Sequence, residues 1–144
     1  MANEISRTTR LAWTRNGAQI IATVTESIDQ IGEQAIESVQ IIGQTSEAIN
    51  LGDVTTPKYV MFKNANNKWS DLTNAQKEAT GYATEAQYNA ANIVHVGATS
   101  PATSVNASFA LNPGNGASII STQAAWYAIG ITEDVNLLVI AIEE

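Results

Sequence analysis

The sequence predicts an all-β fold: a single antiparallel β-sandwich domain over residues 1–144, jelly-roll-like, with about eight or nine strands and a long, partly helical loop insertion. Three observations predict it. Apolar and polar residues alternate over short segments, turn residues such as Asn, Gly and Pro separate these segments, and no helix of crossover length joins them. With 44% hydrophobic and 15% charged residues, the chain is long enough to bury a core of its own.

The first elements are expected to be strands. Residues 5–15 and 18–25 alternate in polarity, and Asn16 and Gly17 between them suit a two-residue hairpin turn. Residues 26–42 have partial helical spacing, but β-branched residues favour a strand over 36–42. A short strand with a turn is expected within residues 46–54. Both faces of the segment 58–64 are partly apolar, which predicts a central strand.

The β pattern then breaks over residues 65–91, a segment rich in Ala, Asn, Thr and Gln. Thr73 and Gln76 have the spacing of a capping box, which predicts a short helix over 74–80 that ends at Gly81. A second helical segment is expected over 85–91. Loops of this length are usually functional or disordered. Further strands are expected at 92–97, 105–111, 117–121, 124–131 and 136–142.

Charge is unevenly distributed along the chain. The net charge is −7, and all seven basic residues precede position 78. This balance argues against nucleic-acid binding and against binding to an anionic membrane. The acidic second half is either a solvated face or a surface that pairs with the basic N-terminal arm of another copy or a partner. No secretion signal or apolar run of bilayer length is expected.

Few residues offer catalytic chemistry. The chain has no cysteine, and its single histidine, His95, stands between two valines and is interpreted as a packing residue. No nucleophile with a base, dense carboxylate loop or phosphate-binding loop is present in the pattern. We therefore expect no catalytic residue, no cofactor and no metal. Trp126 and Tyr127 should lie on opposite faces of a strand, with one of them in the core.

Six residues are candidates for contact with a partner. Three are arginines in the N-terminal arm, and three are aromatic residues in the polar insertion, where large rings either pack under the loop or bind a partner. Both interpretations of the aromatic residues remain open. The six candidates are Arg7, Arg10, Arg15, Trp69, Tyr82 and Tyr88.

One stretch of sequence carries a family resemblance. Residues 49–64, INLGDVTTPKYVMFKN, resemble the core strand pair of small β-sandwich virion proteins of tailed bacteriophages, in which such a run precedes a variable loop. The similarity continues at residues 93–97, 109–114, 126–129 and 137–144, and it covers about the last two-thirds of the chain. It also includes, more loosely, the first strand. Such proteins are capsid decoration or cement proteins, head fibres and small tail components.

The resemblance implies a non-enzymatic virion structural protein. The leading hypothesis is a capsid decoration protein that binds the outside of the head and bridges shell subunits. Its expected partners are the major capsid protein or other virion proteins, and a homo-oligomer is expected, with a trimer favoured by family analogy. Assembly would take place in the host cytoplasm. The alternatives are a tail, neck or baseplate component, and a carbohydrate- or host-receptor-binding module in which Trp69 or Tyr82 stacks on the ligand.

Overall fold

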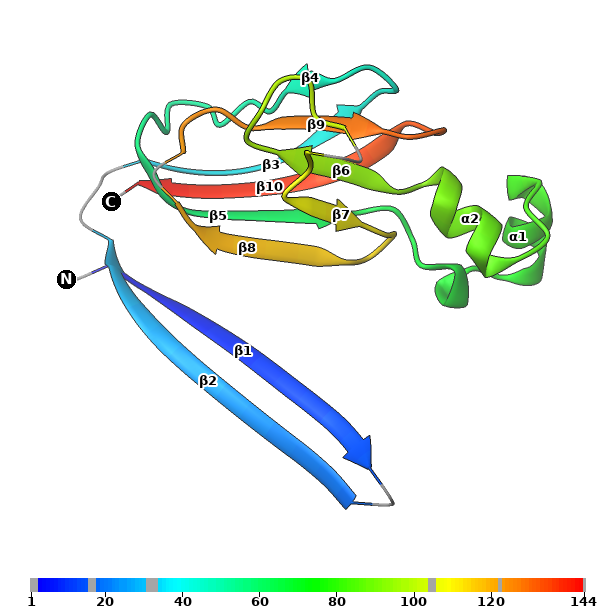
Figure 1. Cartoon of the computed structure of the whole chain (residues 1–144), viewed down its shortest axis with the longest axis horizontal. Helices are drawn as coiled ribbons and strands as arrows, with labels where there is room; N and C mark the ends of the chain where they lie inside the picture. Colours follow the sequence, from blue (N-terminus) through cyan, green and yellow to red (C-terminus); the bar gives the residue numbers. More distant parts are fainter. Residues whose placement is uncertain (1–2, 16–17, 31–33, 104–105, 122, 144) are drawn as a thin grey trace.

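The computed structural model describes residues 3–15, 18–30, 34–103, 106–121 and 123–143 (Figure 1). Strands make up 44% of the structure and helices 15%, and the sheets are antiparallel, which confirms the predicted all-β class. Within the described ranges, no helix has the length and apolar character needed to cross a membrane.

The N-terminal segment forms a long β-hairpin. Strand β1 (Asn3–Arg15) pairs with β2 (Ala18–Gln30) over its whole length and makes a two-stranded sheet of its own. The predicted hairpin is therefore confirmed, while its turn residues Asn16 and Gly17 lie outside the described residues. Figure 1 shows the hairpin extending away from the rest of the chain.

Eight further strands in the described residues form two four-stranded antiparallel sheets. The first, named here the long sheet, has the order β3 (Ala35–Ile42), β10 (Val135–Glu143), β5 (Pro57–Asn64) and β8 (Gly116–Ile120). The second, the short sheet, has the order β4 (Glu47–Ala48), β9 (Tyr127–Gly130), β6 (Val94–Gly97) and β7 (Phe109–Leu111). The predicted central position of β5 is confirmed, since it lies between β10 and β8.

The strands pair in a nested order. The first strand of the two sheets, β3, pairs with the last, β10, and inside that pair β4 pairs with β9, β5 with β8, and β6 with β7. The second half of the chain thus returns along the first half in reverse order. These pairings bring residues far apart in the sequence into one structure.

The core lies where the two sheets face each other. Alternate residues of the long and short sheets share one buried apolar cluster, which includes Phe62 of β5 and Val96 of β6. The Trp126 ring packs 5.1 Å from the Phe62 ring and 6.3 Å from the Phe109 ring, measured between centroids. Trp126 is buried and Tyr127 is half-buried, which confirms the expectation that one of the two lies in the core.

The insertion contains a 3-10 turn, η1 (Trp69–Asp71), and two helices, α1 (Asn74–Thr80) and α2 (Glu85–Ala91). Both helices occur where the sequence predicts them. The capping box is formed: the Thr73 hydroxyl accepts from the Gln76 N–H, and the Gln76 side chain accepts from the Thr73 N–H at 2.8 Å. Gly81 ends α1 at φ 75°, a left-handed conformation that suits glycine.

Several strands are shorter than predicted. The strand expected within residues 46–54 is reduced to β4, because the Asn50 side chain accepts from the Gly52 N–H and Gly52 turns the chain at φ 60°. Of the strand expected over 105–111, the described residues 106–108 lie outside β7, and residue 105 lies outside the described residues. The strand expected over 124–131 is reduced to β9. Side-chain hydrogen bonds to the backbone, such as that from Asn106 Nδ2 to the Pro101 carbonyl, replace strand pairing beside β7.

Candidate functional site

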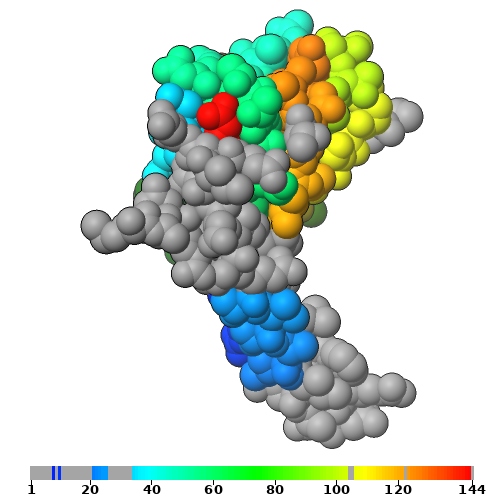
Figure 2. All heavy atoms as spheres, turned by 90° about the vertical axis from the view of Figure 1, so that its left-hand side faces the viewer, coloured from blue at the N-terminus to red at the C-terminus, as the bar shows by residue number. Residues whose placement is uncertain are grey.

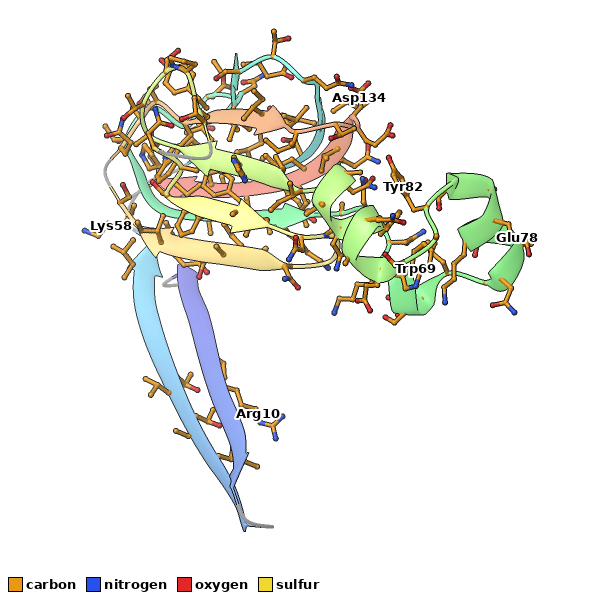
Figure 3. All side chains as sticks on the ribbon, turned by 45° about the vertical axis from the view of Figure 1, so that its right-hand side comes forward. Arg10, Lys58, Trp69, Glu78, Tyr82 and Asp134 are labelled. Atoms are coloured by element: carbon orange, nitrogen blue, oxygen red, sulfur yellow. The ribbon has the colours of Figure 1, made fainter. Side chains whose placement is uncertain are left out.

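The insertion is built around three aromatic rings. Tyr88 of α2 is buried, with its ring centroid 5.4 Å from that of Trp69 and 6.1 Å from that of Tyr82. The Lys77 ammonium lies 5.2 Å from the centre of the Trp69 ring, within cation–π range. The structure thus brings the three aromatic candidates together. Figure 3 shows two of them, Trp69 and Tyr82, at one end of the two sheets. Tyr88 serves packing, whereas Trp69 and Tyr82 are half-buried.

Two hydroxyl groups connect these rings to the rest of the protein. The Tyr88 hydroxyl donates to the Asn67 carbonyl at 2.9 Å, and the Tyr82 hydroxyl donates to the Glu133 carboxylate at 2.6 Å. The second bond links the insertion to the turn between β9 and β10. The hydrogen bond to Glu133 raises the pKa of Tyr82, and burial raises the pKa of Tyr88. Both hydroxyls therefore remain neutral donors at physiological pH.

Four asparagines fix both ends of the insertion. Fully buried Asn64 donates from Nδ2 to the carbonyls of Asn92 and Leu111, at 2.8 and 3.0 Å. Its Oδ1 accepts from the Asn66 N–H, and the Asn66 side chain in turn bonds the side chains of Asn92 and Asn136. Asn66, near the start of the insertion, is thus bonded to Asn92, the first residue after the insertion. Sequence analysis missed this junction, for which the asparagine-rich composition was the one available signal.

A cavity of about 280 Å³ lies between the insertion and the β9–β10 turn. Its walls combine two tyrosine rings with amide, hydroxyl and carboxylate groups, a mixture that suits a small polar ligand. The lining residues are Thr80, Tyr82, Tyr88, Asn92, Glu133 and Asp134. Among the residues that the structure describes, no three His, Cys, Asp or Glu side chains are grouped to hold a metal ion.

His95 lies in β6 and is 7% exposed, in line with the expected packing role. Its Nδ1 has no hydrogen-bond partner, and burial lowers the pKa of the imidazole below its usual 6.5. The ring is therefore held in the neutral form. It takes no part in the aromatic cluster or in the cavity.

The arginine candidates lie in a different part of the molecule. Arg10 is exposed on β1, well away from Trp69 and Tyr82 in Figure 3. Arg7 and Arg15 belong to the same strand, but their side chains lie outside the described residues. The structure therefore separates the six candidates into two groups, one on the hairpin and one on the insertion.

The outer surface of the long sheet carries a group of apolar side chains, a feature that sequence analysis did not find. Exposed Glu37, Lys63 and Asn136 lie among them, paired in register with Ile140, Leu138 and Ile41. Val39 and Ile41 of β3 are 60% and 69% exposed, and Ile120 of β8 is 47% exposed. Between them lie half-buried apolar side chains of the two central strands. This surface, named here the outer apolar face, comprises Val39, Ile41, Met61, Ile120, Leu138, Ile140 and Ile142.

One signal for the outer apolar face was present in the sequence. Residues 137–142 are apolar at both odd and even positions, whereas a strand with one solvated face alternates. The odd positions, such as Leu137 and Val139, are fully buried in the core. The even positions, Leu138 and Ile140, belong to the outer apolar face.

No protein-family model, curated protein sequence or solved structure matches this chain.

Proposed function

We propose that this chain is a jelly-roll β-sandwich that serves as a non-enzymatic structural protein of a tailed-bacteriophage virion. In this proposal it is a capsid decoration protein, which binds the outside of the head and bridges neighbouring shell subunits. The phage assignment rests on the sequence resemblance of residues 49–64 and the segments that follow. The structural observation that carries the role in an assembly is the outer apolar face of the long sheet.

The nested strand pairing supports the jelly-roll assignment. In a jelly roll, an extended hairpin of the whole chain is rolled into two sheets, so that the first strand lies beside the last. The pairs β3 with β10, β4 with β9, β5 with β8 and β6 with β7 follow this order. Jelly rolls are common in viral capsid proteins, but fold alone does not define a function.

Energetics favour a covered outer apolar face. Fully burying a Val or Ile side chain contributes about 1.5–3 kcal/mol, so covering the exposed parts of Val39, Ile41 and Ile120 contributes roughly 3–5 kcal/mol per copy. Exposed apolar side chains grouped on one face of a sheet and flanked by polar residues are typical of a surface that contacts other protein.

The overall shape supports a bridging role. The hairpin and the insertion extend from opposite ends of the two-sheet body (Figure 1). The asparagine junction and the Tyr82–Glu133 hydrogen bond hold the insertion in one position. A rigid extension loses little conformational entropy on binding, so the insertion suits contact with a shell subunit while the rest of the chain contacts a neighbour.

Immuno-electron microscopy of intact particles of the source virus tests this proposal. An antibody raised against the purified chain should label the head surface of intact particles. Label confined to the tail, neck or baseplate would move the chain to that part of the virion, and the decoration role would be rejected. Absence of label on particles that do contain the chain would place it inside the particle and reject the role as well.

The cavity beside Tyr82 favours one second candidate, a carbohydrate-binding module. Its aromatic and carboxylate walls offer a ring for stacking and acceptors for sugar hydroxyls. A glycan array should then give hits that Tyr82→Ala abolishes and that Tyr127→Ala, a half-buried tyrosine on β9 outside the cavity, leaves in place. An array without hits would reject this candidate.

A further inference from the structure

We propose that the outer apolar face is covered by the β1–β2 hairpin of a second copy of this chain, so that copies assemble by exchanging hairpins. This inference deepens the proposed function and rests on its claim that the chain is an assembly subunit. It names the occupant of the outer apolar face. It also assigns the hairpin to contact between copies rather than to contact with the shell.

The hairpin has a register that suits such a contact. The register places most of the large apolar residues of both strands at one set of alternate positions, which also includes the pair Arg7 with Glu26. Half of the residues at the positions between them are Ser or Thr, and that set also includes the pair Ala12 with Ile21. The first set contains the pairs Ile5 with Ile28, Leu11 with Ala22, and Trp13 with Ile20. The second set contains the pairs Ser6 with Ser27, Thr8 with Thr25, and Arg10 with Thr23. One set of positions therefore favours an apolar surface and the other favours water.

The described side chains of the hairpin are exposed in both sets. The Thr8 and Thr25 hydroxyls, which belong to the second set, hydrogen-bond each other at 3.2 Å across the strands. Val24 of the first set is 57% exposed and Ile21 of the second set is 48% exposed, so both faces of the hairpin present an apolar side chain. An isolated two-stranded hairpin is marginally stable in water at best, and packing on an apolar surface is the usual remedy. The hairpin thus needs a covering surface, as the outer apolar face does.

The position of the hairpin favours a second copy over the chain's own body. Figure 1 shows the hairpin extending away from the two sheets of its own chain. Residues 21–25 also stand clear of the two-sheet body in Figure 2, as the hairpin does in Figure 1. A hairpin held away from its own body can lie across the long sheet of a neighbour.

Charge complementarity favours contact between hairpin and body. Residues 5–25 contain three arginines and no acidic residue, while Glu4, Glu26 and Asp29 near the strand ends make the hairpin as a whole neutral. Residues 34–144 contain four lysines and ten acidic residues, a net charge of −6. The cationic middle part of one hairpin is therefore attracted to the acidic body of another copy.

Sedimentation analysis of the purified full-length chain gives the first test. The wild type should form an oligomer of the 15.3 kDa chain. The double variant Val39→Thr/Ile41→Thr should raise the dissociation constant at least tenfold, because it makes the outer apolar face polar while keeping β-branched side chains. Ile131→Thr, at a 42% exposed isoleucine outside that face, is the matched control and should leave assembly unchanged. A monomeric wild type, or unchanged assembly of the double variant, would overturn the proposal.

Cross-linking gives a second test that does not depend on the double variant. The chain has no cysteine, so single cysteines can be introduced at Val24 and at Val39, both exposed. When Val24→Cys and Val39→Cys chains are mixed, a short bismaleimide should join them into a mixed dimer. Cross-linking within one chain of the Val24→Cys/Val39→Cys double variant, with no mixed dimer, would mean that the hairpin covers its own sheet. Linkage of Val24→Cys chains to each other alone would mean that hairpins bundle. Both results overturn the proposal.

These outcomes are separable from those of the proposed function. A monomer that is present on virus heads rejects hairpin exchange and keeps the decoration role. An oligomer that is absent from virus particles keeps hairpin exchange and rejects the decoration role.

Discussion

Replacing Asn64 with leucine tests whether a buried hydrogen-bond junction holds the insertion on the sheets. The Asn64 side chain is fully buried, donates to the Asn92 and Leu111 carbonyls, and accepts from the Asn66 N–H. Leucine has a similar size but can neither donate nor accept. The substitution therefore removes three hydrogen bonds while the site remains filled.

The magnitude follows from the groups left without a partner. A buried polar group that loses its hydrogen bond costs about 1–3 kcal/mol. Three such groups set an upper range that local relaxation and entering water reduce, so we expect Asn64→Leu to lower the free energy of unfolding by about 3–5 kcal/mol. For a domain of this size each kcal/mol shifts the melting temperature by about 2–4 °C, which gives a decrease of about 6–20 °C.

Urea unfolding followed by tryptophan fluorescence measures this change. The matched control is Asn115→Ala, at an exposed asparagine that follows Gly114 in the turn between β7 and β8. The control should change the free energy of unfolding by no more than about 0.5 kcal/mol. A loss below about 1 kcal/mol for Asn64→Leu would refute the role assigned to the junction.

Three further substitutions probe other contacts. Burial lowers the pKa of His95 below 6.5, so wild-type stability should fall as the pH drops from about 7 to 5, and His95→Gln should flatten this part of the pH profile. The Thr55 backbone N–H holds the pKa of Glu143 below its usual 4.5; Glu143→Gln should therefore destabilise the protein above pH 4.5, with the difference from wild type disappearing in stronger acid. Gly130→Ala would bring a Cβ to 2.6 Å from the Glu133 carbonyl oxygen and should cost about 3 kcal/mol, measured by thermal unfolding.

Each of these expectations has a clear contrary result. For His95→Gln it is a pH profile parallel to that of the wild type. For Glu143→Gln it is a stability difference that persists at pH 2. For Gly130→Ala the comparison is Gly81→Ala, where the backbone is left-handed but no heavy atom lies within 4 Å of the added Cβ, so the cost should be about 1 kcal/mol. A larger loss at Gly81 than at Gly130 would contradict the crowding described for Gly130.

Local signals in the sequence predicted the elements that depend on neighbouring residues. Thr73, Gln76 and Gly81 lie within nine residues of each other and determine where α1 begins and ends. The alternation in the first 25 residues likewise predicted the hairpin, because a two-residue turn brings adjacent segments together. Residues close together in the sequence determine such elements, and the structure confirms both predictions.

Contacts between distant residues could not be predicted in this way. Asn64 bonds the Leu111 carbonyl across 47 residues of sequence, and Tyr82 bonds Glu133 across 51. The sequence singled out Trp69, Tyr82 and Tyr88 but left packing and partner binding equally open, because their mutual contacts depend on how α2 folds back on η1. The outer apolar face was missed because it requires the register of β3, β10, β5 and β8 together.

The number of copies of this chain in the virion tests the proposed function most directly. Quantitative peptide mass spectrometry on purified particles of the source virus would give the ratio of this chain to the major shell protein. A decoration protein that bridges shell subunits predicts a simple, near-stoichiometric ratio. A ratio many times lower would contradict decoration of the head and indicate a tail or neck component, and complete absence from the particles would contradict the virion assignment itself.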